Sequence, residues 1–214
     1  MKELLETLRV QRWDDHRYYH HSRINQSLHL VSALSFLVSY VLLFINPVIA
    51  ALVAWLVSMT TRQAGHFFFE PRGYDHVNQA THEHKEIIKV GYNLHRKIVL
   101  LLIWAAIPVI AYFAPQYLTW AVPEAYEDTF VRMVGMTWLF LGVAGLLFRA
   151  VQIFFREDFK SALAWVVKIL TDPFHDVLLY YPIADRYAEP GNALLQHFDG
   201  MEKNFEDTDF EALS

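Results

Sequence analysis

The chain has 214 residues, which suits a single domain; 54% of them are hydrophobic and only 19% are charged. The formal net charge of −5 gives no reason to expect a nucleic-acid partner. The chain has no cysteine, which excludes disulfides, thiolate metal sites and a cysteine nucleophile.

The first 21 residues are charged and contain no short apolar stretch, so we expect no cleavable signal peptide. Four apolar segments follow that have about the length needed to cross a membrane, over residues 28–45, 48–69, 98–113 and 131–155. Asn46-Pro47 predicts a tight turn between the first two, because proline cannot continue the preceding helix. In the fourth segment, Gly135, Gly142 and Gly145 are residues that allow close helix packing, but they do not by themselves indicate a homo-oligomer.

These segments predict an all-α fold, an integral membrane bundle of about four transmembrane helices plus interfacial helices. We expect one polytopic domain over residues 1–198 and an acidic, loosely ordered tail over 199–214.

The distribution of Lys and Arg predicts the orientation in the membrane. Basic residues precede the first apolar segment, recur between the second and third, and follow the fourth, whereas residues 114–130 contain none. We therefore expect both termini and the loop 71–97 to be cytoplasmic, in the bacterial inner membrane in preference to the endoplasmic reticulum. All eleven histidines then lie in or beside cytoplasmic segments.

The first polar cluster surrounds the start of the first apolar segment. On one unbroken helix, His20 and His29 would lie on opposite faces, so they converge only if the backbone breaks between them. Ser22 or Asn25 is a candidate N-cap that would supply this break. The alternative is that His, Tyr and Arg side chains simply anchor the helix end.

The second cluster ends the second apolar segment. Gln63, His66 and Glu70 recur at helical spacing and share a face, and Pro71 predicts that the helix ends at Glu70. An ionisable residue at membrane depth is costly, so it indicates a functional site. A plain hydrogen bond between His66 and Glu70 is the alternative.

Two further clusters lie in polar segments. His82 and Glu86 share a face in the loop, where exposed polar residues are the alternative. Asp172-Pro173 predicts the start of a short helix after an amphipathic stretch over 159–170, with His175 and Asp176 in its first turn. Here the alternative is a capped surface helix.

Imidazole and carboxylate ligands without thiolate suit Fe, Mn or Zn. The chain has no Gly-x-Ser-x-Gly elbow and no phosphate-binding glycine loop. The polar clusters therefore favour a histidine-rich metal site at one membrane face.

Two motifs within residues 13–71 resemble a known family. His20, Asn25 and His29 form one pattern, and Gly65, His66 and Glu70 form the other. Both resemble the membrane family of Fe(II)-dependent 2-hydroxy fatty acid dioxygenases, which act in fatty acid alpha-oxidation and have bacterial relatives. The chain departs from the family after Glu70, where Pro71 and a histidine-bearing loop stand in place of basic residues.

The resemblance implies that one Fe(II) ion is held by His20, His29 and His66. His21 is adjacent to a matching position, and Glu70 is either a ligand or orients His66. The further metal-ligand candidates are His82, His175 and Asp176, which leave a second metal open. Asn25 and Gln63 are expected to orient the ligands.

The implied function is a membrane oxygenase acting on a lipid or fatty acid, with dioxygen cleaving a 2-hydroxy fatty acid between C1 and C2. The four catalytic residues would be His20, His29, His66 and Glu70. One alternative is a di-iron hydroxylase or desaturase, since His16, His20 and His21 form one histidine box, although no second box follows. Another is a non-enzymatic scaffold, transporter or metal-binding protein; the uncharged centres of the four segments argue against transport.

Overall fold

The computed structural model describes residues 2–18, 23–69, 73–75, 78–88 and 94–185, and these are almost entirely helical. The long helices are α1 (Lys2–Tyr18), α2 (Arg23–Leu43), α6 (Leu94–Phe113), α7 (Phe130–Arg156) and α8 (Phe159–Asp185). The shorter elements are α3 (Pro47–Leu52), η1 (Val53–Met59), α4 (Thr60–Phe68), α5 (His82–Ile88), η2 (Pro115–Tyr117), η3 (Thr119–Ala121) and η4 (Glu124–Tyr126). Within the described ranges an isolated bridge between Asp75 and Ala80 is the only β-type pairing. The all-α prediction is confirmed.

Three helical segments are long and apolar enough to cross a membrane: Arg23–Leu43, Pro47–Phe68 and Phe130–Arg156. A shorter apolar helix covers Lys97–Phe113. These four match the four predicted segments to within a few residues. The second of them runs through α3, η1 and α4, and η1 is a π-helical stretch in its middle. The predicted tail over 199–214 lies outside the described residues.

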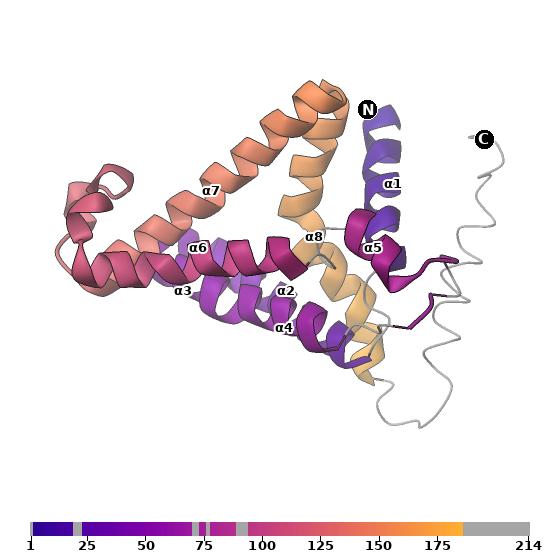
Figure 1. Cartoon of the computed structure of the whole chain (residues 1–214), viewed down its shortest axis with the longest axis horizontal. Helices are drawn as coiled ribbons and strands as arrows, with labels where there is room; N and C mark the ends of the chain where they lie inside the picture. Colours follow the sequence, from indigo (N-terminus) through magenta and orange to yellow (C-terminus); the bar gives the residue numbers. More distant parts are fainter. Residues whose placement is uncertain (1, 19–22, 70–72, 76–77, 89–93, 186–214) are drawn as a thin grey trace.

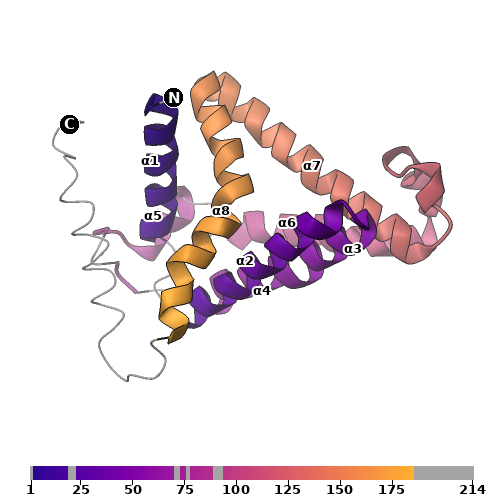
Figure 2. The same cartoon turned by 180° about the vertical axis from the view of Figure 1, so that it is seen from behind.

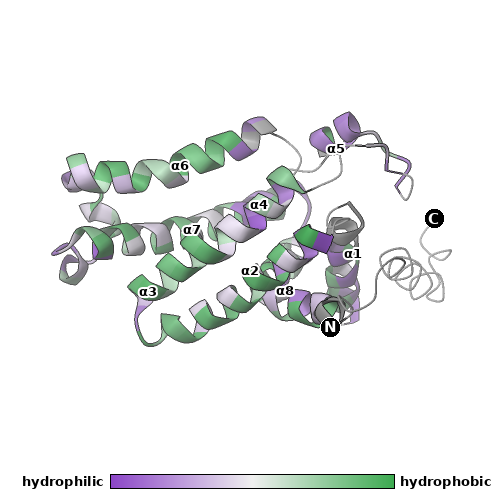
Figure 3. Ribbon diagram, turned by 90° about the horizontal axis from the view of Figure 1, so that it is seen from below, coloured by the Kyte–Doolittle hydropathy of each residue, from purple (hydrophilic) through white to green (hydrophobic). Residues whose placement is uncertain are grey.

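The pattern of burial is the reverse of that in a water-soluble domain. The largest fully buried side chains are all polar: His29, Gln26, Asn25, Asp176, Ser32 and Ser58. Large apolar side chains such as Phe44 and Phe148, which are 91% and 71% exposed, cover the outside. Apolar residues line α3, α6 and α7 in Figure 3, whereas α5 is mostly hydrophilic. A lipid bilayer is the solvent that suits such a surface.

α2 and the continuous segment of α3, η1 and α4 form a hairpin. Its turn is at Asn46, whose side-chain oxygen accepts a hydrogen bond from the Ile49 N–H at 3.2 Å, with Pro47 at the first helical position. The predicted turn is therefore confirmed. α7 packs on α3 and α6 packs on α7, while α8 crosses α2 obliquely with α1 at its side (Figures 1 and 2).

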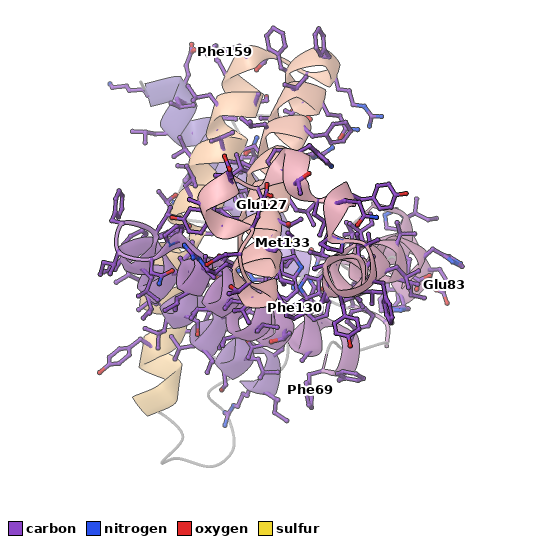
Figure 4. The ribbon with its side chains drawn as sticks, turned by 90° about the vertical axis from the view of Figure 1, so that its left-hand side faces the viewer. Phe69, Glu83, Glu127, Phe130, Met133 and Phe159 are labelled. Atoms are coloured by element: carbon purple, nitrogen blue, oxygen red, sulfur yellow. The ribbon has the colours of Figure 1, made fainter. Side chains whose placement is uncertain are left out.

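An apolar core closes the end of the molecule near residues 114–129. Its buried members are Ile107, Ala111, Leu118, Val122, Met133, Val134 and Trp138. The rings of Trp104 and Trp138 stack at 5.5 Å, and the Trp55 indole N–H donates to the Trp138 carbonyl at 3.0 Å. Met133, which is buried, lies near the centre of the view in Figure 4, and Phe159 lies at the top of it. This core joins α6 and α7 to η1.

The structure corrects two of the predicted local features. No short helix begins at Asp172-Pro173, because α8 runs unbroken through Pro173. Proline removes one helical hydrogen bond. α8 packs on α2 both before and after Pro173: the Tyr40 hydroxyl donates to the Leu170 carbonyl, and the His29 ring lies beside the Tyr180 ring. This packing offsets the loss.

The other correction concerns the start of α2. Asn25 is no N-cap: it lies inside this helix and is fully buried. Its side chain is used in a contact with α4 instead. Ser22, the other predicted cap, lies outside the described residues.

Gly135 allows the close approach of α7 to α3. A Cβ at this position would lie 2.8 Å from Val48 Cγ1 and 3.2 Å from the Val48 carbonyl oxygen. By contrast, a Cβ at Gly145 would meet nothing within 4 Å. Close packing is thus a property of Gly135 and not of all three glycines.

We expect Gly135→Ala to destabilise the bundle by about 1–3 kcal/mol, because the added methyl group pushes on the backbone of α3. Thermal unfolding of the detergent-purified protein measures this. Gly145→Ala on the same helix is the matched control and should not lower the unfolding midpoint. Equal midpoints for Gly135→Ala and the wild type would contradict the packing described for this helix pair.

Candidate metal centre

The hairpin brings two histidines together. His29 near the start of α2 and His66 near the end of α4 lie at the same end because the chain reverses at Asn46. Their ring centres are 4.8 Å apart and their ring planes are inclined at 79°. His29 is only 1% exposed. This pairing places two of the predicted ligands side by side.

A missing side chain makes this contact possible. A Cβ at Gly65 would lie 2.0 Å from Asn25 Oδ1 and 3.6 Å from His29 Cδ2. The Asn25 amide therefore fills the space next to α4 that any other residue at position 65 would need. Asn25 and His29 are four residues apart on α2, so both face α4. The two sequence motifs thus meet in one contact.

The spacing of the two rings suits metal binding. Metal–nitrogen bonds of about 2.1 Å put each ring centre about 3.3 Å from the ion, so two imidazoles at about 90–100° have centres about 4.6–5 Å apart. The observed 4.8 Å lies in this range. The distance is therefore compatible with two ligands of one metal ion, and it is also the distance of an ordinary edge-to-face ring contact.

The other predicted ligands of this centre are not placed. Across the part of the chain that the structure describes, no three His, Asp or Glu side chains are grouped to hold a metal ion. His20, His21 and Glu70 lie outside the described residues. The convergence of His20 with His29 requires a break between them, and α1 and α2 are separate helices that run in different directions (Figure 1).

An ion pair holds α8 against this centre. Arg62, one turn before His66 on α4, donates to Asp176 Oδ2 at 2.6 Å. One turn after Asp176, the ring of Tyr180 lies 6.3 Å from that of His29. Asp176 was predicted as a metal ligand. In the described structure its side chain joins α8 to α4. Sequence reasoning missed Arg62, although a cation in an apolar helix is itself a signal that a buried partner exists.

Asp172, one turn before Asp176 on α8, faces cations from α1 and from α8 itself. Arg12 Nε lies 3.4 Å from Asp172 Oδ1, and Lys168 Nζ lies 3.9 Å from Asp172 Oδ2. Burial raises the pKa of Asp172, and the nearby cations oppose this shift. Burial raises the pKa of Asp176 to about 6, with Arg62 opposing. The pKa of His175 is lowered by burial and by the charge of Arg12.

The loop between α4 and α6 forms a local unit. His82 and Glu86 share a face as predicted, with His82 Nε2 3.6 Å from Glu86 Oε1. Sequence reasoning missed the ion pair of Lys85 with Asp75. Lys85 Nζ lies 2.5 Å from Asp75 Oδ2, and the two side chains are only 3% and 4% exposed. Among the described residues, neither His82 nor His175 joins the two central histidines in a group able to hold a metal.

A cavity of about 350 Å³ lies between η1, α4, α6 and α7, and neither His29 nor His66 is among the residues that line it. Gln63, predicted to orient a ligand, lines it together with Lys97. The Lys97 ammonium donates to the His66 carbonyl oxygen at 3.4 Å and lies 4.6 Å from the centre of the Phe67 ring. Lys97 is only 7% exposed, so its charge is held inside the protein.

The fold and the site define a class, a helical membrane protein in which a buried histidine meets a half-buried one. Comparison with protein-family models, with curated proteins and with solved structures finds no match. The likeness to the dioxygenase family therefore stays a prediction from two motifs, and function has to be argued from the site.

We expect Arg62→Gln to destabilise the protein more at pH 8 than at pH 5. Removing this cation raises the pKa of Asp176 above about 6. A carboxyl whose pKa is higher in the folded than in the unfolded state stabilises the fold at low pH and loses that contribution as pH rises through the folded pKa. The loss at pH 8 should be about 3 kcal/mol.

Thermal unfolding at the two pH values measures this difference. Arg132→Gln is the matched control, because Arg132 pairs with Asp128 on an exposed surface and should give a small, pH-independent effect. An equal loss at pH 5 and pH 8 for Arg62→Gln would show that the charge of Asp176 does not depend on Arg62.

Gly65→Ala should lower the unfolding midpoint, because the new methyl group collides with the Asn25 amide. The double variant Asn25→Ala/Gly65→Ala removes the colliding oxygen and should recover part of the loss. Thermal unfolding of the wild type, both single variants and the double variant measures this coupling. Additive losses in the double variant would contradict the contact.

Proposed function

We propose that the protein is a metal-dependent membrane oxygenase acting on a lipid, with His29 and His66 as two ligands of one Fe(II) ion. The observation that carries this proposal is the pair of imidazoles at 4.8 Å, brought together from two helices, with His29 fully buried and His66 half-buried. His20 is proposed as the third ligand from the sequence motif, with Glu70 as a ligand or as the partner that orients His66.

The substrate that we propose is a 2-hydroxy fatty acid. In a balanced reaction, this acid and dioxygen give the fatty acid one carbon shorter, carbon dioxide and water, with cleavage between C1 and C2. Bound Fe(II) would supply open coordination positions for the substrate and for dioxygen activation. An apolar outer surface gives the acyl chain access from the bilayer.

The chain's own residues cover the His29 side of the proposed centre. Asn25, Gln26, His29 and Tyr180 are at most 3% exposed, so bulk water is kept from the imidazole of His29. A dry site strengthens the electrostatic interactions within it and limits side reactions of an oxidising centre. Arg62 and Asp176 keep α8 in place as part of this cover.

We also propose that both termini and the loop 71–97 face the cytoplasm, in the bacterial inner membrane. The concentration of Lys and Arg in these segments and their absence from residues 114–130 support this orientation. The Asn46 turn and residues 114–129 lie at one end of the molecule, away from α1 and α5, which agrees with it (Figures 1 and 2).

Turnover by the purified protein tests the reaction. Protein loaded with Fe(II) without oxygen, then given a 2-hydroxy fatty acid and dioxygen, should release the acid one carbon shorter, as detected by mass spectrometry. His29→Ala and His66→Ala should each lower the rate by about 100-fold or more, because loss of a ligand costs at least as much as loss of a group that orients one.

His95→Ala is the matched control, since His95 is exposed at the start of α6, outside the pair. It should retain the rate of the wild type. Product formation that survives in His29→Ala and His66→Ala would contradict the assignment of the centre, and absence of the shortened acid in the wild type would contradict the reaction.

A further inference from the structure

The chain between α6 and α7 folds back onto the side of α7. Leu118 and Val122 are buried in the apolar core, and the ring of Trp120 lies 5.1 Å from the ring of Phe140. Phe140 is ten residues after the start of α7, a helix long and apolar enough to cross a membrane. Residues 115–122 therefore lie beside the first turns of a membrane helix, at the end of the molecule that faces the viewer in Figure 4.

Two large aromatic side chains point outward from this segment. Tyr117 ends η2 and Trp120 lies in η3, three residues on, and a 3₁₀ turn places residues at this spacing on one side. Tyr117 and Trp120 are 68% and 75% exposed, whereas Leu118 between them is buried. We call Tyr117 and Trp120 the aromatic edge. Each ring is apolar with one polar group, a character that suits the boundary between an apolar and a polar phase.

The polar groups of this segment are paired within it. The backbone N–H groups of Tyr117, Leu118, Ala121 and Val122 each donate to the carbonyl three residues earlier, at 2.9–3.3 Å. The indole N–H of Trp120 donates to the Tyr117 carbonyl oxygen at 2.8 Å. Hydrocarbon cannot replace a missing hydrogen bond, so this internal pairing allows the segment to lie at the edge of the acyl layer.

The charge of this segment does not suit acidic lipids. Residues 112–131 contain no Lys or Arg, and three carboxylates follow the aromatic edge, at Glu124, Glu127 and Asp128. Anionic headgroups attract clusters of Lys and Arg, and they repel carboxylates. The partner that fits best is therefore the headgroup layer of a neutral phospholipid, which the rings contact without help from charge.

We infer that the aromatic edge anchors this end of the bundle in the headgroup layer of a neutral phospholipid leaflet, where Trp and Tyr side chains are enriched in membrane proteins. α3 begins beside the same part of α7, where Gly135 meets Val48. The helical run from Pro47 to His66 then rises about 30 Å, which is about the thickness of the hydrocarbon core. The anchor thus also sets the depth of His66, near the boundary of the opposite leaflet. Anchoring requires neither metal nor dioxygen, so the inference goes beyond the proposed function.

Spin labels measure the depth of the aromatic edge, because a chain without cysteine accepts a single labelled cysteine. Tyr117→Cys, with Trp120 retained, carries a nitroxide in phosphatidylcholine vesicles, and its collisions with oxygen and with a water-soluble nickel chelate are compared. Phe148→Cys and Glu124→Cys are the references for hydrocarbon and for water, because both residues are exposed. The label at 117 should lie between the two. A depth equal to either reference, or low collision rates with both reagents because protein or a second copy covers the label, would overturn the anchor.

Substitutions of Trp120 test whether the aromatic edge fixes this depth. Trp120→Tyr keeps a ring with a polar group and should leave the label at 117 at its depth. Trp120→Leu keeps an apolar side chain against Phe140 but favours hydrocarbon, so the label should shift toward the depth of the Phe148 reference. Equal depths in the two variants would overturn the role of Trp120. A label at 117 that moves when phosphatidylglycerol replaces part of the phosphatidylcholine would overturn the choice of a neutral headgroup.

The same labels separate this inference from the proposed function. His29→Ala should lose iron and turnover but leave the label at 117 at its depth, and a change of that depth would overturn an anchor that needs no metal. Phe68→Cys, on an exposed residue one helical step beyond Phe67, reports the depth of the end of α4. Its label should lie near a leaflet boundary, and a label in the middle of the hydrocarbon would overturn the placing of His66.

Discussion

The amide of Asn25 occupies the space that a side chain at Gly65 would fill, and the geometry of the site depends on this contact. Because α2 and α4 approach so closely there, His29 and His66 meet at 4.8 Å instead of facing separate surroundings. The Asn46 turn makes the contact reachable by folding one helix back along the other. A glycine and an asparagine thus determine how closely the two histidines approach.

The bundle divides its polar and apolar contacts between its two ends. Stacked tryptophans and the apolar core join α6, α7 and η1 at one end, whereas buried polar residues of α2, α4 and α8 meet at the other. Between them lies the cavity, with Lys97 among its lining residues. In a bilayer, apolar surface does not drive helices together, so such polar contacts and close packing must hold the bundle. The Arg62–Asp176 pair is the clearest example.

The sequence predicted the features that depend on local pattern. The spans follow from apolar runs and the turn from Asn46-Pro47. The meeting of His29 with His66 was expected only from the resemblance of two motifs to a family. Features that depend on distant partners were missed or wrong. Arg62 and Asp176 are 114 residues apart, and α8 continues through Pro173 because of what it packs against. The cavity requires the placement of η1, α4, α6 and α7, which no single segment encodes. The predicted roles of His20, His21 and Glu70 fall outside the described residues.

The central claim is that His29 and His66 bind the same metal ion. Elemental analysis of the detergent-purified protein, after anaerobic loading with Fe(II) and removal of free metal, tests it most directly. The account predicts about one iron per chain in the wild type and its loss in both His29→Ala and His66→Ala, with His95→Ala unaffected. No bound iron in the wild type, or iron retained by both variants, would contradict the claim, and two irons per chain would favour a di-iron enzyme instead.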